Sequence, residues 1–411
     1  MGLQRVLILG GGFGGLRAAR SLKKANVKIT LVDRTNHHLF QPLLYQVASS
    51  ALAPRDIAFP IREILKRQKN TSVIMDDGCK ILPKEKKVHF TSGRILSYDY
   101  LIVAIGTRHA YFGHPQWEEH APGLKTLNDA IHLRNKILTT FEQAEAADSR
   151  AKAQELLTFV VVGGGPTGVE LAGAIGEIAQ KTMRKNFRNI DPTQSKIYLI
   201  EAGKELLPSY PAALSKRAKL DLTKIGIKVL TNSAVTKINK EGVQIGERSI
   251  GTTNIFWAAG NQAPQLLTSL ETPLDKQNRV LVNADLTIPD HPTLFVIGDA
   301  AHTEDEAGNE LPAIAPVAIQ QGQYVGHLIA KKIGAQKRPA FRYKDKGSMA
   351  TIGKARAVAL IGGRQYTGFT AWALWSLIHI VYLLDFRNRM GVFMEWFWWY
   401  ITEKRSSRLI H

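Results

Sequence analysis

The chain has 411 residues, 45% of them hydrophobic and 22% charged, so it is long enough for two or three globular domains and too apolar to be disordered. Its one cysteine, Cys79, excludes an internal disulfide, a pair of redox-active cysteines and a cysteine-rich metal site, and we expect a buried structural thiol. The formal net charge of +19 suggests an anionic partner, either a membrane surface or a nucleic acid.

The first predicted element is a strand that runs into a glycine-rich loop and a helix. An apolar run at 6–9 precedes the sequence GGGFGG, and Leu16, Ala19 and Leu22 then recur at helical spacing. The strand begins so early that we expect no signal peptide. The loop fits the dinucleotide-binding pattern G-x-G-x-x-G, and the next strand ends in an acid that can accept hydrogen bonds from a ribose. The residues predicted to bind a cofactor here are Gly10, Gly12, Phe13, Gly14, Gly15, Asp33 and Arg34.

The same pattern recurs in the middle of the chain. The run 159–162 is followed by a second glycine loop, by a helix with proline near its start, and by a strand that ends in Glu201. The spacing to this acid is longer than usual, and we expect an insertion that extends the helix and then loops back. Glu201 would repel a 2′-phosphate, which favours NADH over NADPH. The predicted binding residues are Gly163, Gly165, Pro166, Thr167, Gly168 and Glu201.

Two dinucleotide sites in one chain predict one tightly bound cofactor and one that exchanges. A flavin enzyme that takes hydride from a nicotinamide needs this arrangement, with FAD bound and NADH as the substrate. Three further strands end in small residues or an acid that could lie against such cofactors. These positions are Ala104, Gly106 and Thr107, then Ala259 and Gly260, and finally Asp299.

The C-terminal part combines aromatic and basic residues. Residues 331–411 hold 15 Lys and Arg against 4 Asp and Glu, and five of the seven tryptophans lie after 371. The apolar segment 371–384 is shorter than the roughly 20 residues that span a bilayer. Trp372 and Trp375, like Trp396 and Trp399, share a helical face, so we expect two short helices lying in an anionic membrane interface. The alternative is a helical hairpin packed on the sheet domains or on a second subunit.

His379 is almost the only ionisable group in that apolar segment. It could donate a proton to a reduced substrate, or it could be a histidine satisfied within the core. We expect no metal site, because no further cluster of His, Asp or Glu shows ligand spacing.

With these features the chain resembles the type II NADH:quinone oxidoreductases, also called alternative NADH dehydrogenases. The resemblance covers nearly the whole chain. It rests on both glycine loops and on the stretches HHLFQPLLYQVASSALAP, LFVIGDAA, APVAIQQGQYVG and YKDKGSMATIGKARAVA together with the aromatic tail. Many members have glutamine at the position of Pro316, so a side-chain bond from that position to a quinone is in doubt.

The resemblance implies an α/β fold with two Rossmann-like domains, in which the NADH domain is inserted into the FAD domain. The FAD domain would comprise 1–110 and 266–335, the NADH domain 111–265, and a membrane-associating α+β region 336–411. Implied partners are non-covalent FAD, NADH, a membrane quinone, anionic lipid and a second copy of the chain, and no nucleic acid. The implied location is peripheral, on the cytoplasmic face of the inner membrane of a bacterium.

The resemblance also suggests roles for particular residues. Glu170, expected in the first turn of the second loop's helix, would face the junction of flavin and nicotinamide. Gln320 and Gln321 are candidates near the quinone head. Further cofactor contacts would come from Gln41, Ala315, Pro316 and Val317.

Two alternatives remain at this stage. A reductase of a soluble acidic carrier such as ferredoxin would also use a strongly basic surface. A basic flavoprotein that binds nucleic acid is the other. Disulfide reductases and sulfide:quinone oxidoreductases depend on cysteines, so the single cysteine disfavours both.

Overall fold

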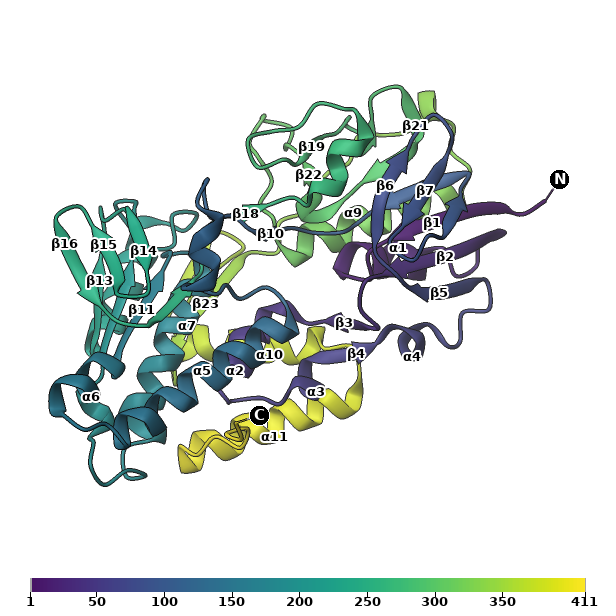
Figure 1. Cartoon of the computed structure of the whole chain (residues 1–411). Coiled ribbons are helices and arrows are strands. Elements are labelled where there is room, and N and C mark those ends of the chain that lie inside the picture. Colours follow the sequence, from purple (N-terminus) through teal and green to yellow (C-terminus); the bar gives the residue numbers. More distant parts are fainter. Residues whose placement is uncertain (1, 411) are drawn as a thin grey trace. The chain divides into compact units, whose positions relative to one another are not determined.

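The computed structural model describes residues 2–410, and the chain divides into two compact units (Figure 1). The first unit comprises residues 1–39, 59–108 and 261–345. The second comprises 40–58, 109–260 and 346–411. Each unit is therefore assembled from three separated stretches, and the short stretch 40–58 joins the second unit, a grouping that the sequence did not predict.

The first unit is built on a six-stranded sheet with the order β20-β21-β9-β1-β2-β5, parallel except for the β20–β21 pair. Strands such as Gln4–Leu9 and Tyr100–Val103 are apolar because both faces of a parallel sheet are covered. Helix α1 (Phe13–Ser21) packs beside α9 (Ala315–Ala330). A small antiparallel sheet, β6-β7-β8, completes the apolar core.

The strands of this unit are β1 (Gln4–Leu9), β2 (Val27–Asp33), β3 (His37–Leu39), β5 (Thr71–Met75), β6 (Gly78–Leu82), β7 (Lys87–Phe90), β8 (Ile95–Ser97), β9 (Tyr100–Val103), β18 (Asn261–Gln262), β19 (Val280–Leu281), β20 (Thr287–Ile288), β21 (His291–Val296) and β22 (Ala301–His302). Its other helical segments are α4 (Ile61–Leu65), η5 (Gln265–Leu270), η6 (Gly298–Ala300) and η7 (Ala335–Lys337). The strands β4 (Ala58–Pro60) and β10 (Arg108–His109) lie where the chain passes between units.

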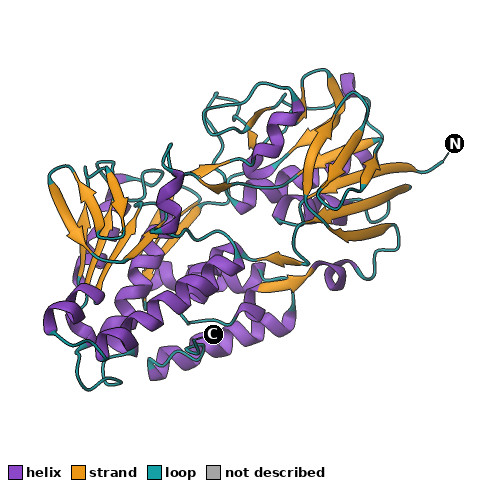
Figure 2. Ribbon diagram, in the orientation of Figure 1, coloured by secondary structure: helices purple, strands orange, loops and turns teal. Residues whose placement is uncertain are grey.

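The second unit repeats the design with a four-stranded parallel sheet, β13-β12-β11-β17. Helices pack on the strands in this unit as in the first (Figure 2). Its longest helix, α5 (Leu127–Glu145), begins at a reciprocal cap in which Thr126 and Asp129 each accept the other's backbone N–H. Two antiparallel sheets, β14-β15-β16 and β23-β24-β25, flank the parallel one.

The strands of the second unit are β11 (Thr158–Val162), β12 (Lys196–Ile200), β13 (Ile227–Leu230), β14 (Lys237–Asn239), β15 (Gly242–Ile245), β16 (Arg248–Gly251), β17 (Asn254–Trp257), β23 (Ser348–Gly353), β24 (Arg356–Ile361) and β25 (Arg364–Thr367). Its remaining helical segments are η1 (Gln41–Leu43), α2 (Leu44–Ala48), α3 (Pro54–Ile57), η2 (Pro115–Glu119), α6 (Arg150–Leu156), α7 (Pro166–Glu177), η3 (Ile178–Thr182), η4 (Pro192–Gln194), α8 (Ala212–Lys224), α10 (Gly368–Tyr382) and α11 (Phe386–Thr402).

The structure tests two predictions, one about the insertion after the second glycine loop and one about Cys79. The insertion after the second glycine loop continues α7 as a short π-helix, η3, before the chain returns to β12, as predicted. Cys79 lies exposed on β6, so the prediction of a buried thiol is wrong. The side chain of Ile81, two residues on, is the buried one on that strand. Among residues 2–410, no helix combines the length and apolar character needed to cross a bilayer.

Candidate functional site

The first glycine loop lies between β1 and α1 and leaves backbone open where a phosphate would approach. A Cβ added at Gly15 would meet the Gly10 carbonyl oxygen at 1.9 Å, so this glycine is required for the helix to pack on the strand. A Cβ added at Gly12 would meet nothing within 4 Å. The backbone N–H groups at the start of α1 thus border free space, which suits an anionic pyrophosphate.

The second loop, between β11 and α7, has the same geometry. A Cβ at Gly168 would meet the Gly163 carbonyl oxygen at 1.8 Å, whereas one at Gly165 would meet nothing within 4 Å. Pro166 is the first residue of α7, where its missing N–H costs no helix bond. Both loops therefore fit a dinucleotide in their own geometry, independently of the sequence pattern.

The acid at the end of each second strand holds its glycine loop in place. Asp33 accepts a hydrogen bond from Gly11 N at 2.6 Å, and its other oxygen accepts from Thr35 N and Oγ1. Glu201 likewise accepts from Gly164 N at 2.6 Å and from Gly203 N at 2.6 Å. The carboxylates are thus positioned at the loops, where a ribose hydroxyl would also lie.

His38, on β3, packs against the first loop. The ring is buried, its Nδ1 lies 2.9 Å from the Gly11 carbonyl oxygen, and it meets Phe13 edge to face. Burial lowers the pKa of His38, so the neutral ring braces the loop at neutral pH. In the sequence, His37 and His38 precede an apolar run, and this local pattern does not indicate a contact with Gly11, 27 positions away.

Beside the first glycine loop and Asp33, the candidate site of the first unit includes residues at strand ends and on α9. Thr107 Oγ1 donates to Asp299 Oδ2 at 3.4 Å, beside the turn η6. Buried Gln321 fixes that turn, because its Oε1 accepts from Gly298 N at 2.6 Å and its Nε2 donates to Thr303 Oγ1 at 3.2 Å. The predicted positions Ala104, Gly106, Ala315, Pro316 and Val317 occupy the end of β9 and the first turn of α9.

Other predicted contacts are distributed over both units. Arg34 is exposed directly after β2. In the second unit, Gln41 Nε2 donates to the Lys125 carbonyl at 3.0 Å, and Ala259 and Gly260 follow β17. These positions remain predictions as cofactor contacts.

A partly buried acid occupies the second turn of α7. Glu170 is the fifth residue of that helix, so its expected place in the first turn is wrong and the helix dipole does not explain it. Surrounding protein raises the pKa of its carboxyl to about 8, against one weak bond from Thr351 N at 3.4 Å. Glu170 therefore carries a proton at pH 7 and releases it near pH 8.

Glu170 borders a cavity of about 40 Å³ in the second unit, room for two or three water molecules. Its other polar lining includes Tyr45, Glu177 and Arg405, and four tryptophans also line it, Trp372, Trp375, Trp396 and Trp399. Arg405 Nη2 pairs with Glu177 Oε2 at 3.1 Å, and its Nη1 donates to the Ser49 carbonyl. Among the described residues, the lining atoms Trp375 Nε1, Ser376 Oγ and Arg405 Nε find no hydrogen-bond partner.

Comparison with known proteins places this geometry in a family. The model of the family described as pyridine nucleotide-disulphide oxidoreductase matches residues 4–322. The chain is 40% identical over 421 residues to the type II NADH:quinone oxidoreductase Ndh of Mycobacterium tuberculosis, covering 99% of this chain and 90% of that protein. It is also 40% identical to NdhA of the same organism, covering 96% and 87%. The chain belongs to the type II NADH:quinone oxidoreductase family.

The fold agrees with this family membership. The solved structure of NDH2 from Plasmodium falciparum in complex with NADH superposes with a TM-score of 0.90, covers 99% of each chain and is 21% identical in sequence. The α/β architecture with Rossmann-like parallel sheets is thereby confirmed.

Two predicted catalytic side chains are engaged elsewhere in this type II oxidoreductase. Gln320 makes a double hydrogen bond with the backbone of Lys344, donating from Nε2 and accepting at Oε1, both at 2.9 Å. That pairing uses the amide that the sequence assigned to the quinone, and the neighbouring Gln321 holds η6 instead. The buried ring of His379 stacks on Trp375 and its Nδ1 donates to the Trp375 carbonyl at 2.7 Å.

Burial lowers the pKa of His379 to about 4, so the ring is neutral at pH 7. At neutral pH the uncharged ring donates to a backbone carbonyl, as in the alternative of a satisfied core histidine, and the proton-donor role stays a prediction. The ring also lies 6.2 Å from Phe40, edge to face.

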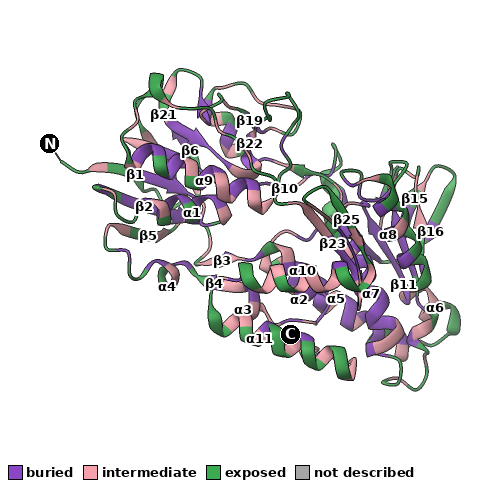
Figure 3. Cartoon of the chain, turned by 180° about the vertical axis from the view of Figure 1, so that it is seen from behind, coloured by how far each residue is buried: buried purple, intermediate pink, exposed green. Residues whose placement is uncertain are grey.

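The tail is helical as expected, but one tryptophan of each predicted lipid-facing pair points inward. Trp375 and Trp396 are buried with their rings 5.2 Å apart, and Trp396 Nε1 donates to Gln46 Oε1 at 2.7 Å. Arg405, one of the basic residues of the tail, is buried against Glu177. Exposed stretches, drawn green, lie along α10 and α11 in Figure 3. Their exposed apolar side chains are Phe369, Leu377, Val381 and Tyr382 on α10 and Phe386, Met390, Phe393, Met394, Phe397, Trp398, Tyr400 and Ile401 on α11.

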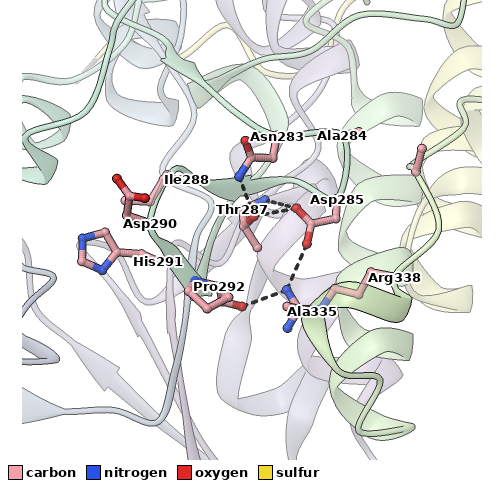
Figure 4. A pocket seen from close by; sticks show the side chains of 11 residues that line it. Asn283, Ala284, Asp285, Thr287, Ile288, Asp290, His291, Pro292, Ala335 and Arg338 are labelled. Atoms are coloured by element: carbon pink, nitrogen blue, oxygen red, sulfur yellow. Dashed lines mark hydrogen bonds and ion pairs between the residues drawn. The ribbon is translucent and has the colours of Figure 1, made fainter.

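A separate hollow of about 350 Å³ lies in the first unit near β20 (Figure 4). Its polar groups satisfy one another. Asp285 accepts from Thr287 and pairs with Arg338 Nη1 at 3.0 Å, and the same nitrogen donates to the Pro292 carbonyl at 2.8 Å. We therefore assign it a structural role. Among residues 2–410, no group of His, Cys, Asp and Glu could hold a metal ion.

Proposed function

We propose that this protein is a membrane-associated, non-proton-pumping oxidoreductase that passes two electrons from NADH to a membrane quinone, with non-covalently bound FAD as its cofactor. The observation that carries the proposal is the pair of glycine loops, each with open backbone at its second glycine, in a chain 40% identical to a type II NADH:quinone oxidoreductase. Two dinucleotide cradles and a single cysteine suit an enzyme that needs a flavin and a nicotinamide but no disulfide.

In this proposal the first unit holds FAD. The N–H groups around Gly12 would hold the pyrophosphate, Asp33 would accept from the adenosine ribose, and Asp299 at η6 would accept from the ribityl chain. Gln321 and His38 would support these positions through their hydrogen bonds with Gly298 N and the Gly11 carbonyl. When bound, FAD supplies the redox chemistry, accepting hydride from NADH and passing the electrons to quinone.

The second unit binds NADH in the same way, at Gly165 and the N-terminus of α7. Glu201 excludes a 2′-phosphate by its charge, and it is held in place by Gly164 N and Gly203 N. NADH is therefore favoured over NADPH.

Glu170 acts as the proton-holding group in this proposal. Reduction of a quinone consumes two protons, and a carboxyl with a pKa of about 8 carries one at neutral pH. Water in the adjoining cavity would contact Glu170 and link it toward Glu177. The buried Tyr45 lines the same cavity as both acids.

The exposed apolar faces of α10 and α11 would lie in the membrane interface, where quinone dissolves. We further propose a homodimer at the cytoplasmic face of a bacterial inner membrane. An exposed apolar surface of this extent counts against a soluble ferredoxin-type carrier or a nucleic acid as partner.

The test is the pair of half-reactions. NADH added without oxygen should bleach the yellow colour of the purified protein, and a short-chain quinone should restore it. A colourless protein, or a colour that persists with NADH, would refute the cofactor and the donor. Bleaching followed by restoration with a ferredoxin but not with quinone would refute the acceptor.

A further inference from the structure

A basic pocket of about 430 Å³ lies in the second unit, outside the nucleotide loops and the Glu170 cavity. We call it the α8–α10 pocket. Its lining comes from α8, from the turn between β23 and β24, and from the first residues of α10, and comprises Arg217, Asp221, Lys224, Lys354, Ala355, Arg356, Gly368 and Phe369. Figure 3 shows α8, β25 and α10 near one another on this side of the unit.

The charges in this pocket are unbalanced. Of its four cationic side chains, Arg217 pairs with Asp221 and Lys354 pairs with Glu403, which leaves Lys224 and Arg356 without a carboxylate partner among the described residues. Asp221 is 1% exposed and accepts from Arg217 Nε at 2.8 Å. A Cβ added at Gly368 would lie 3.7 Å from Arg217 Nη2, so the guanidinium lies beside the start of α10. Two uncompensated cations beside a guanidinium match the chemistry of a phosphate group.

A second feature adds an apolar edge to the same pocket. Phe369 lines it while 59% exposed, and it begins a row of exposed apolar side chains along α10. Leu377 and Val381, four residues apart, share one side of α10 and lie about 80° and 120° around its axis from Phe369, within one broad apolar stripe. A ligand that fills both parts has a phosphate at one end and an apolar body at the other.

Lys354 is oriented by the C-terminal segment. Its Nζ pairs with Glu403 Oε1 at 3.2 Å and lies 4.8 Å over the Tyr400 ring. Lys181 shares the same carboxylate at 3.0 Å. The pocket is therefore connected to the end of α11, whose exposed rings belong to the proposed membrane face.

We propose that the α8–α10 pocket binds the phosphate of an anionic phospholipid, with the acyl chains running along α10 from Phe369. The inference rests on the membrane association under the proposed function and adds a defined headgroup site outside the aromatic tail. A soluble acidic protein or a nucleic acid would use the cations but would gain nothing from the apolar row beside them.

The test uses the purified full-length protein and two charge-matched double variants. Lys224→Gln with Arg356→Gln removes two pocket cations and leaves the Arg217–Asp221 and Lys354–Glu403 pairs intact. Lys216→Gln with Lys219→Gln removes two exposed cations of α8 that do not line the pocket. Co-sedimentation is measured with vesicles of phosphatidylcholine alone and with added phosphatidylglycerol.

We expect the pocket variant to bind the anionic vesicles roughly 30-fold more weakly than the control variant, since it loses two cations that each contribute about 1 kcal/mol near an anionic surface. Binding to phosphatidylcholine alone should be equal in both. Equal binding of both variants to the anionic vesicles would refute the site. If the double variant does not fold, the single variant Lys224→Gln, at an exposed position, is compared with Lys216→Gln.

Soluble probes separate a lipid from free phosphate. Dihexanoyl phosphatidylglycerol should raise the melting temperature of the wild type and the control variant but not of the pocket variant, and inorganic phosphate or glycerol phosphate should not match it. An equal rise in melting temperature with inorganic phosphate would refute the lipid assignment. A pocket variant that lost binding to DNA but kept its binding to the anionic vesicles would also refute it. Bleaching by NADH is measured in parallel, so failure of the electron-transfer proposal is seen separately.

Discussion

At the scale of single residues, the acids of this protein serve two opposite purposes. Asp33 and Glu201 are ionised partners of backbone N–H groups and hold the glycine loops. Glu170 has almost no partner, and surrounding protein raises its pKa to about 8. A group poised near neutral pH inside a cavity is typical of proton transfer, whereas the loop acids have a positional role.

The substitution Glu170→Gln should show whether Glu170 transfers protons or only has a positional role. We expect flavin reduction by NADH to continue, with reoxidation by quinone slowed at least about tenfold, because a positioned acid contributes that much or more. In the wild type the quinone rate should fall as pH rises through about 8, where Glu170 loses its proton. Stopped-flow measurement of both half-reactions across this range checks it.

The control for that experiment is Glu205→Gln, which removes an exposed acid of the same unit. The raised pKa of Glu170 also makes the free energy of unfolding depend on pH. The contribution of Glu170 to that free energy is full below the ordinary carboxyl pKa of 4.5 and is lost as pH rises through about 8. An unaltered quinone rate and pH profile in Glu170→Gln would refute the proton-holding role.

Residues at fixed local spacing were predictable from the sequence, and residues joined by tertiary contact were not. The glycine loops follow from spacing because strand, turn and helix are neighbours in the chain. The Arg405–Glu177 pair joins residues 228 positions apart, and no local pattern marks either partner. For the same reason Gln320 could not be told from Gln321, whose contact with Gly298 decides their roles.

At the scale of elements, α10 and α11 show where periodicity stops being informative. Both helices are apolar on nearly every side, so spacing predicts that tryptophans share a face but not which way that face points. The structure turns Trp375 and Trp396 inward and leaves phenylalanines outside. Trp396 is retained inside because its N–H finds the Gln46 amide oxygen.

Phe393→Ser and Phe397→Ser therefore test the membrane face without touching the core. These rings are 49% and 52% exposed on α11. Transfer of the exposed half of each ring into lipid is worth about 1 kcal/mol, so each change should weaken vesicle binding roughly fivefold. Thermal unfolding should stay close to that of the wild type.

Ile95→Ser is the matched control, since Ile95 is 52% exposed on β8 of the first unit. It should leave vesicle binding unchanged. If Ile95→Ser weakened binding as much as Phe393→Ser does, the membrane face would not be confined to α10 and α11.

The ion pair between α7 and the tail is the other element-level feature with a measurable consequence. Arg405→Gln should cost about 3–5 kcal/mol in urea unfolding, because it leaves Glu177 buried without its cation. Arg405→Met combined with Glu177→Leu should cost less than Arg405→Gln alone. Lys152→Ala, in the exposed pair with Glu155, should cost less than about 1 kcal/mol. A loss this small for Arg405→Gln would mean that the pair does not hold the tail.

At the scale of the whole molecule, the C-terminal segment is part of the second unit's core as well as the proposed membrane face. Asn388 donates to the Arg55 and Asp56 carbonyls, Trp396 to Gln46, and Arg405 to Ser49. All four acceptors lie in the stretch 40–58, which explains why that stretch joins the second unit. The sequence predicted the Rossmann architecture but treated 336–411 as a region apart.

Deletion of residues 386–411 should thus destabilise the protein rather than release a soluble enzyme. We expect aggregation on size-exclusion chromatography and a lower urea midpoint, in contrast to the Phe393 and Phe397 variants, which should remain folded. A truncated protein with wild-type stability would show that the buried contacts of Trp396 and Arg405 contribute little.

The interleaving of the two units also sets an order of events while the chain is being made. The first unit has all of its residues once position 345 has emerged from the ribosome, whereas the second still lacks Arg405. At about 5–20 residues per second, that wait of 60 residues lasts about 3–12 s. During this interval Glu177 of α7 has no cationic partner, and the surface that α11 later covers is exposed. A chaperone or the lipid surface could bind the nascent second unit there.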